Sequence, residues 1–169
     1  IKILLPEEVR NAENQIRSLG LGSLVDEVVV KMNRAAEDAS SDAKPIFWDA
    51  IRGMTITDGM KILKGTDTSA TNYLRVNTTN GLYNAYKPKI ETSMEEVGLQ
   101  STWSQIATPY NQAAALAGWK PLPGDLSQYI TQRALNGLFI VVGQKERDIR
   151  KDPLKRVTEL LQKVFGSLD

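Results

Sequence analysis

The side chains in this sequence that could do chemistry are mainly carboxylates, because the chain contains neither histidine nor cysteine. Thiolate catalysis, histidine acid–base catalysis, disulfides and the common zinc sites are therefore excluded. A pair of Asp or Glu side chains could still hydrolyse a glycosidic bond. The sequence has 20 such residues, and their spacing singles out no pair.

Two pairs of opposite charges stand at helical spacing. Glu146 precedes Arg150 by four residues, the order and distance that favour an ion pair on one helix face. Arg34 precedes Glu37 by three residues, beside Asn33 and an apolar helix face. We interpret the first pair as a structural ion pair and the second as a surface pair of small energetic weight. For Asn33, Arg34 and Glu37, a polar patch lining a cleft is the alternative.

Other polar residues have the positions of helix caps. Thr55 and Asp58 have the spacing of a capping box, and Asp67 can cap the next turn. Helix N-termini can also bind an anion. A ligand-binding site at the helix start is therefore the alternative for Asp58 and for Asp67. The sequence contains neither a glycine-rich phosphate loop nor an acidic calcium loop. We expect no metal ion and no cofactor.

The elements that carry these residues are predicted from apolar residues at helical spacing. The clearest helix is predicted over 125–150, with Asp125 and Gln128 as a capping box at its start. Pro153 begins another helix, which ends at Gly166. The central helix has a wide apolar arc, so we expect it to be surrounded by other helices. That arc comprises Leu126, Ile130, Ala134, Leu138, Val141 and Val142.

Further helices are predicted to begin at Pro6, Ser23, Thr55, Thr78 or Thr79, and Ser101, with a break or kink over 40–45 and a loop over 118–124. Pro88 and Pro109 fall inside two of them and are expected to kink them. No long alternation of apolar and polar residues predicts a strand. We therefore predict an all-α, single-domain bundle over 1–169, with about eight or nine helices around the helix 125–150 and no sheet.

The charge balance argues against nucleic acid as a partner. The 21 Lys and Arg residues nearly cancel the 20 Asp and Glu residues, so no strong positive field is expected. No apolar run has the length of a membrane-spanning segment. The three tryptophans, Trp48, Trp103 and Trp119, are expected to pack in or beside the core rather than form a ligand cage.

Four stretches together resemble one bacterial family, known as domain of unknown function four-one-nine-seven. The stretches are Asn33–Glu37; Phe47–Ile51 with Met54–Asp58; Gly65–Thr71 with Tyr73; and Ala134–Phe139 followed by Ile149–Pro153. The resemblance extends from about Ile3 to Gly166. It implies an all-helical protein with no assigned activity.

The resemblance also implies export to the periplasm or secretion, since members of this family carry an N-terminal export signal and a further N-terminal segment. The chain begins with Ile1 instead of Met, so we expect a processed or trimmed product. Recurrent polar positions of the family are candidates for ligand binding or for a structural polar network. They correspond to Asn33, Arg34, Glu37, Asp58, Asp67, Thr71, Tyr73, Glu146 and Arg150.

These observations favour a non-catalytic, exported helical binding or interaction protein of the bacterial cell envelope. Its expected partner is an apolar or amphipathic small molecule, held in a groove between kinked helices, or an envelope protein. One alternative is a carboxylate-only hydrolase of an envelope polymer, which predicts two facing acids, at least one with a raised pKa. Another is a subunit of a larger assembly.

Overall fold

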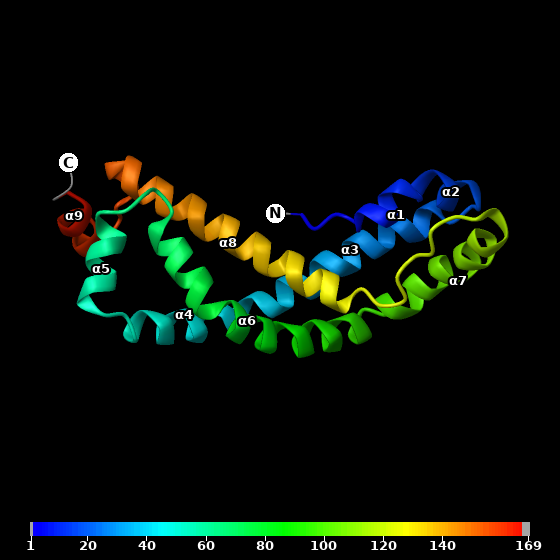
Figure 1. Cartoon of the computed structure of the whole chain (residues 1–169), viewed down its shortest axis with the longest axis horizontal. Coiled ribbons are helices and arrows are strands. Elements are labelled where there is room, and N and C mark those ends of the chain that lie inside the picture. The colour runs from blue at the N-terminus through cyan, green and yellow to red at the C-terminus, as the bar shows by residue number, and fades with distance from the viewer. Residues whose placement is uncertain (1, 167–169) are drawn as a thin grey trace. The chain divides into compact units, whose positions relative to one another are not determined.

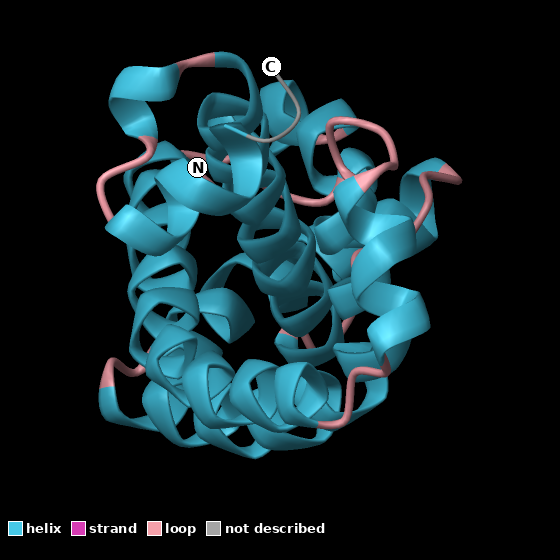
Figure 2. Cartoon of the chain, turned by 90° about the vertical axis from the view of Figure 1, so that its left-hand side faces the viewer, coloured by secondary structure: helices cyan, strands magenta, loops and turns pink. Residues whose placement is uncertain are grey.

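The computed structural model describes residues 2–166, and all regular secondary structure in that range is helical (Figure 2). The predicted all-α class is confirmed. The chain packs into two compact units: unit 1 comprises 1–41 and 83–134, and unit 2 comprises 42–82 and 135–169. The boundary falls inside two long helices, α6 (Ser69–Glu96) and α8 (Ser127–Lys151). The prediction of a single domain stays a prediction.

Unit 1 holds most of the buried apolar side chains. It contains α1 (Glu7–Asn11), α2 (Glu13–Ser18), α3 (Gly22–Ala39) and α7 (Leu99–Ala117), with the end of α6 and the start of α8. Helix α3 packs against α7, and α2 packs against α3 (Figure 1). Helix α3 buries one face at helical spacing, formed by Val25, Val28, Met32, Ala35 and Ala39.

Unit 2 has a much smaller core. A short 3-10 helix (Ser40–Asp42) leads into α4 (Ala43–Arg52) and α5 (Ile56–Leu63), and another (Pro153–Lys155) leads into α9 (Glu159–Gly166). The buried apolar residues in its described part are Ala43, Leu82, Leu135 and Phe139. The Phe139 ring lies 6.0 Å from that of Phe47.

Helix α6 corrects one prediction. It runs without a break through Thr78 and Thr79, where a new helix was expected to start. Both hydroxyls donate 2.6 Å hydrogen bonds to carbonyl oxygens four residues earlier, those of Leu74 and Arg75. Threonine can make this bond within a helix as readily as it caps one, so its identity alone did not decide the boundary. Pro88 lies inside this helix and Pro109 inside α7.

Helix α8 begins close to the predicted position, but its cap differs. Asp125 accepts 2.8 Å hydrogen bonds from the backbone N–H and the hydroxyl of Ser127, which takes the place expected for Gln128. Its buried face is also narrower than predicted, because Val141 is 41% exposed. Within residues 2–166, no helix combines the length and the apolar character needed to cross a membrane.

Candidate functional site

The carboxylate of Glu146 is bound to the start of α6. Its Oε1 accepts a 2.9 Å hydrogen bond from the backbone N–H of Ala70, and its Oε2 accepts bonds from the N–H (2.8 Å) and hydroxyl (2.7 Å) of Thr71. The first N–H groups of a helix have no partner within the helix, and they favour a negative charge. Glu146 therefore caps α6 from a distant part of the chain, with 8% of the residue exposed.

The guanidinium of Arg150 continues this contact to the end of α5. It lies 2.9 Å from Glu146 Oε1, which confirms the predicted ion pair. Its Nη1 and Nη2 donate to the carbonyl oxygens of Leu63 (3.3 Å) and Ile62 (2.8 Å). These carbonyls belong to the last turn of α5, where the regular helical hydrogen bonds end, and that of Ile62 also accepts a 3.2 Å bond from the N–H of Gly65. One ion pair on α8 thus caps the start of α6 and the end of α5.

A second arginine, Arg156, extends the network, and the sequence analysis missed it. Its residue is 4% exposed, and its guanidinium donates 3.0 Å hydrogen bonds to the carbonyl oxygens of Ile149 and Arg150 at the end of α8. Gln162 of α9 donates to the carbonyl of Arg156, and the Arg150 guanidinium lies 5.4 Å from the centre of the Phe165 ring. A basic residue just after a helix C-terminus was the available signal.

The surroundings of Glu146 stabilise the charged form of its carboxylate. Burial alone would raise the pKa of Glu146, but the hydrogen bonds from Ala70, Thr71 and Arg150 outweigh it, so the pKa is lowered. Both carboxylate oxygens are occupied by protein donors. This geometry supports the structural alternative for Thr71, Glu146 and Arg150 over ligand binding.

The remaining candidates of unit 2 also contact other parts of the chain. Asp67 forms an ion pair with Lys151. The hydroxyl of Tyr73 donates to the carbonyl of Ala50 at 3.3 Å. Asp58 completes the predicted capping box at the start of α5, where its N–H donates to the Thr55 hydroxyl oxygen at 3.1 Å and its carboxylate accepts from the Thr55 N–H at 3.2 Å.

The unit 1 candidates share one shallow depression of about 460 Å³. Asn33 exchanges hydrogen bonds with the backbone of Ile3 (2.7 and 2.8 Å) and so binds the N-terminal segment to α3. Arg34 and Glu37 are exposed. The prediction that they pair is wrong for the described structure, because none of its ion pairs joins them.

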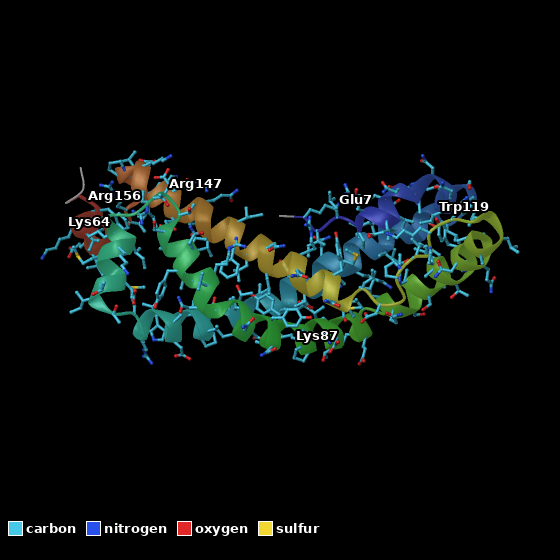
Figure 3. All side chains as sticks on the ribbon, in the orientation of Figure 1. Glu7, Lys64, Lys87, Trp119, Arg147 and Arg156 are labelled. Atoms are coloured by element: carbon cyan, nitrogen blue, oxygen red, sulfur yellow. The ribbon has the colours of Figure 1, made fainter. Side chains whose placement is uncertain are left out.

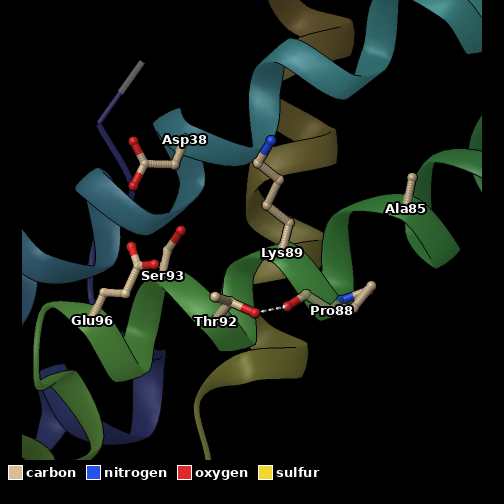
Figure 4. A pocket seen from close by; sticks show the side chains of 7 residues that line it. All are labelled: Asp38, Ala85, Pro88, Lys89, Thr92, Ser93 and Glu96. Carbon is tan, nitrogen blue, oxygen red and sulfur yellow. Dashed lines mark hydrogen bonds between the residues drawn. The ribbon is translucent and has the colours of Figure 1, made fainter.

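A larger open depression of about 700 Å³ lies between α3 and α6 of unit 1 (Figure 4). It brings Asp38 of α3 near Ser93 and Glu96 of α6, while the Thr92 hydroxyl donates to the carbonyl of Pro88 at 3.1 Å. The described residues include no cluster of three acids that could hold a metal ion.

The pKa shifts give the hydrolase alternative no support. That alternative predicts a carboxyl with a raised pKa. Among residues 2–166, the carboxyls with a displaced pKa are Glu8, Glu27, Asp58 and Glu146, and the pKa of each is lowered. In Glu8 a backbone hydrogen bond is the main cause, and in Glu27 the hydrogen bond from Lys31.

Comparison with known proteins identifies the family. The model of the family described as "Protein of unknown function (DUF4197)" matches residues 1–166. The chain belongs to this family, so the resemblance found in the sequence is confirmed. Neither a curated protein nor a solved structure matches the chain.

Proposed function

We propose that this member of the DUF4197 family is a non-catalytic interaction protein of the bacterial cell envelope, exported to the periplasm or secreted, and that unit 2 binds the surface of an anionic phospholipid bilayer. The envelope location rests on the family resemblance. The binding role rests on one observation: ten of the fifteen large apolar side chains that are exposed in the described structure belong to unit 2.

We define the apolar surface of unit 2 by five residues. Ile56 and Met60 lie one turn apart on α5, and they are 89% and 45% exposed. Leu154, Val157 and Leu160 follow one another at intervals of three before and within α9, and they are 87%, 80% and 70% exposed. Single exposed apolar residues are ordinary, but such a concentration marks an interaction site.

The buried polar network links the end of α5 to α9, the two helices that carry most of this surface. Arg150 donates to the end of α5 and lies over Phe165 of α9. Arg156 binds the segment between α8 and α9 to the end of α8. The network therefore serves the proposed function by positioning α5 and α9, not by contacting a ligand.

Exposed lysines accompany the apolar side chains. Lys64 follows α5, Lys155 stands between Leu154 and Val157, and Lys163 lies on α9. None of the three has an ion-pair partner in the described part of unit 2. Figure 3 shows Lys64 and Arg156 at the same end of this unit. Apolar side chains beside unpaired cations match the interface of an anionic bilayer, which offers hydrocarbon below negative headgroups.

The exposure of these side chains favours a bilayer over a protein helix as the partner. A helix that binds through its apolar face needs a groove to receive it. Ile56, Leu154 and Val157 are instead at least 80% exposed, so they project from the protein. A deformable bilayer accepts projecting side chains. A protein partner is the competing outcome of the test below.

Vesicle flotation tests the proposal with a double variant, Leu154→Asp/Val157→Asp. We expect the natural chain to float with phosphatidylglycerol-containing vesicles and not with pure phosphatidylcholine. Because complete burial of one such side chain contributes about 1.5–3 kcal/mol, the variant should bind more than about tenfold more weakly. Leu116→Asp is the matched control, since Leu116 is 93% exposed in unit 1.

Three results would contradict the proposal. The first is that the natural chain fails to float with the anionic vesicles. The second is that the double variant floats to the same extent as the Leu116→Asp control. A third result is that the natural chain does not bind vesicles but self-associates, and that the double variant does not self-associate. In that case the surface binds protein and the lipid proposal is wrong.

A further inference from the structure

We propose that unit 1 contains a separate site that binds a pyranose ring of a saccharide at Trp119. We call this site the Trp119 pocket; it is independent of the proposed lipid-binding surface. It is a depression of about 510 Å³, within the usual size range of small-molecule sites. Its lining comes from α1, α2, the middle of α7 and the segment that follows α7, and it includes Glu7, Glu8, Asn11, Gln15, Tyr110, Trp119 and Lys120.

An aromatic platform forms one side of the pocket. Trp119 is 39% exposed, whereas Tyr110 beside it is 3% exposed. Their ring centres lie 5.7 Å apart with 34° between the planes, so the buried ring supports the exposed one. Trp119 is partly buried against Tyr110, and its exposed part offers an apolar ring surface to the C–H groups of a sugar.

The segment that carries Trp119 is held in place at several points. Gly118 ends α7 with a φ of 70°, a conformation that glycine adopts without strain. The side chain of Asn111 bonds both the N–H (2.8 Å) and the carbonyl (3.2 Å) of Leu122. The indole N–H of Trp103 donates to the carbonyl of Pro123 at 2.8 Å. Such a fixed segment loses little conformational freedom when a ligand binds.

Polar side chains without protein partners also line the pocket. Within residues 2–166, the side chains of Glu7 and Asn11 have no hydrogen-bond or ion-pair partner, and Gln15 Oε1 is buried without one. Lys120 Nζ lies 3.5 Å from Glu8. The pocket therefore offers donors from Asn11, Gln15 and Lys120 and acceptors from the same amides and the two carboxylates.

This mixed set fits a saccharide better than a cation. A sugar hydroxyl both donates and accepts, so a polyol can pair with amides, carboxylates and an ammonium together. The apolar face of its ring can lie on Trp119. A quaternary ammonium would be attracted by the aromatic ring and by Glu7 and Glu8, but it would meet the positive charge of Lys120 and leave the amides unpaired.

Indole N–H resonances in ¹H–¹⁵N spectra provide the test, because the chain has three tryptophans. Trp119→Phe assigns the relevant signal. Maltose, N,N′-diacetylchitobiose and tetramethylammonium chloride are titrated separately. We expect at least one of the two sugars to shift the Trp119 signal with a Kd on the order of 1 mM. Asn11→Ala and Glu7→Gln should each weaken binding by about fivefold.

Trp48→Phe in unit 2 is the control and should leave the Kd unchanged, as should Leu154→Asp/Val157→Asp. The saccharide proposal is overturned if neither sugar shifts the Trp119 signal at about fifty times the expected Kd. It is equally overturned if only tetramethylammonium shifts that signal, which would identify a cation site. Circular dichroism of each variant establishes that it is folded.

Discussion

Glu146 and Arg150 lie one turn apart on α8, and the 2.9 Å ion pair between them joins the start of α6 to the end of α5. Both side chains are 8% exposed. The pair contacts the N–H groups of Ala70 and Thr71 and the carbonyl oxygens of Ile62 and Leu63. We therefore assign the pair a positioning role: it holds the helices that carry the apolar surface of unit 2.

Removing the carboxylate should be costly. Glu146→Ala leaves Arg150 without its charge partner and the N–H groups of Ala70 and Thr71 without an acceptor, so we expect a loss of about 3–5 kcal/mol in the free energy of unfolding. Urea denaturation measures this loss. Glu91→Ala is the matched control, because Glu91 forms an exposed i,i+4 ion pair with Lys87; its cost should be below about 1 kcal/mol. Equal costs would refute the assignment.

Stability should depend on pH through the same residue. The folded-state pKa of Glu146 is lowered from its ordinary value of 4.5. Such a group stabilises the fold above its unfolded-state pKa, and the contribution is lost as the pH falls through the lower, folded-state pKa. The free energy of unfolding should therefore decrease on acidification from neutral pH to about pH 3, and more steeply in the natural chain than in Glu146→Gln. Identical slopes would show that Glu146 contributes nothing to this dependence.

Arginine is required at position 150. Arg150→Lys keeps the charge but cannot reach Glu146 and the carbonyls of Ile62 and Leu63 together, so we expect a loss of about 1–3 kcal/mol. Hydrogen exchange should become faster at the end of α5 and in α9. Arg147→Lys, at an exposed position on α8, should change neither quantity. Unchanged exchange in Arg150→Lys would argue against its capping role.

Gly65 should not tolerate a side chain. A Cβ at this position would lie 2.8 Å from the carbonyl oxygen of Lys61 and 2.8 Å from Ser69 Cβ, so Gly65→Ala should cost about 1–3 kcal/mol in calorimetry or urea denaturation. Gly124→Ala is the control, because nothing lies within 4 Å of a Cβ there. A Gly65→Ala variant as stable as this control would mean that the turn between α5 and α6 relaxes freely.

Local features of this fold could be predicted from the sequence because their partners are close in the chain. The capping box of Thr55 and Asp58 and the ion pair of Glu146 and Arg150 span three and four residues, and both are confirmed. The start of α8 was predicted within a few residues, since Asp125 signals it. Even locally, Thr78 and Thr79 misled the prediction, because the same hydroxyl can cap a helix or bond within one.

Distant partners could not be predicted in this way. Glu146 accepts from Ala70 across 76 positions of the chain, and helical periodicity carries no information about which helix end a side chain reaches. The pairing of Tyr110 with Trp119 was undecided for the same reason. Val141 is exposed because the face of α8 that is buried in unit 2 carries Leu135 and Phe139, and Val141 points away from that face at helical spacing.

The most direct measurement of the proposed function uses the absence of cysteine from the chain. Val157→Cys and Leu116→Cys each create one thiol for an environment-sensitive nitrobenzoxadiazole dye, at positions that are 80% and 93% exposed in unit 2 and unit 1. With phosphatidylglycerol vesicles, the dye at position 157 should brighten and shift to shorter wavelength, while the dye at position 116 should not change. No change at position 157, or the same change at both positions, would contradict lipid binding through unit 2.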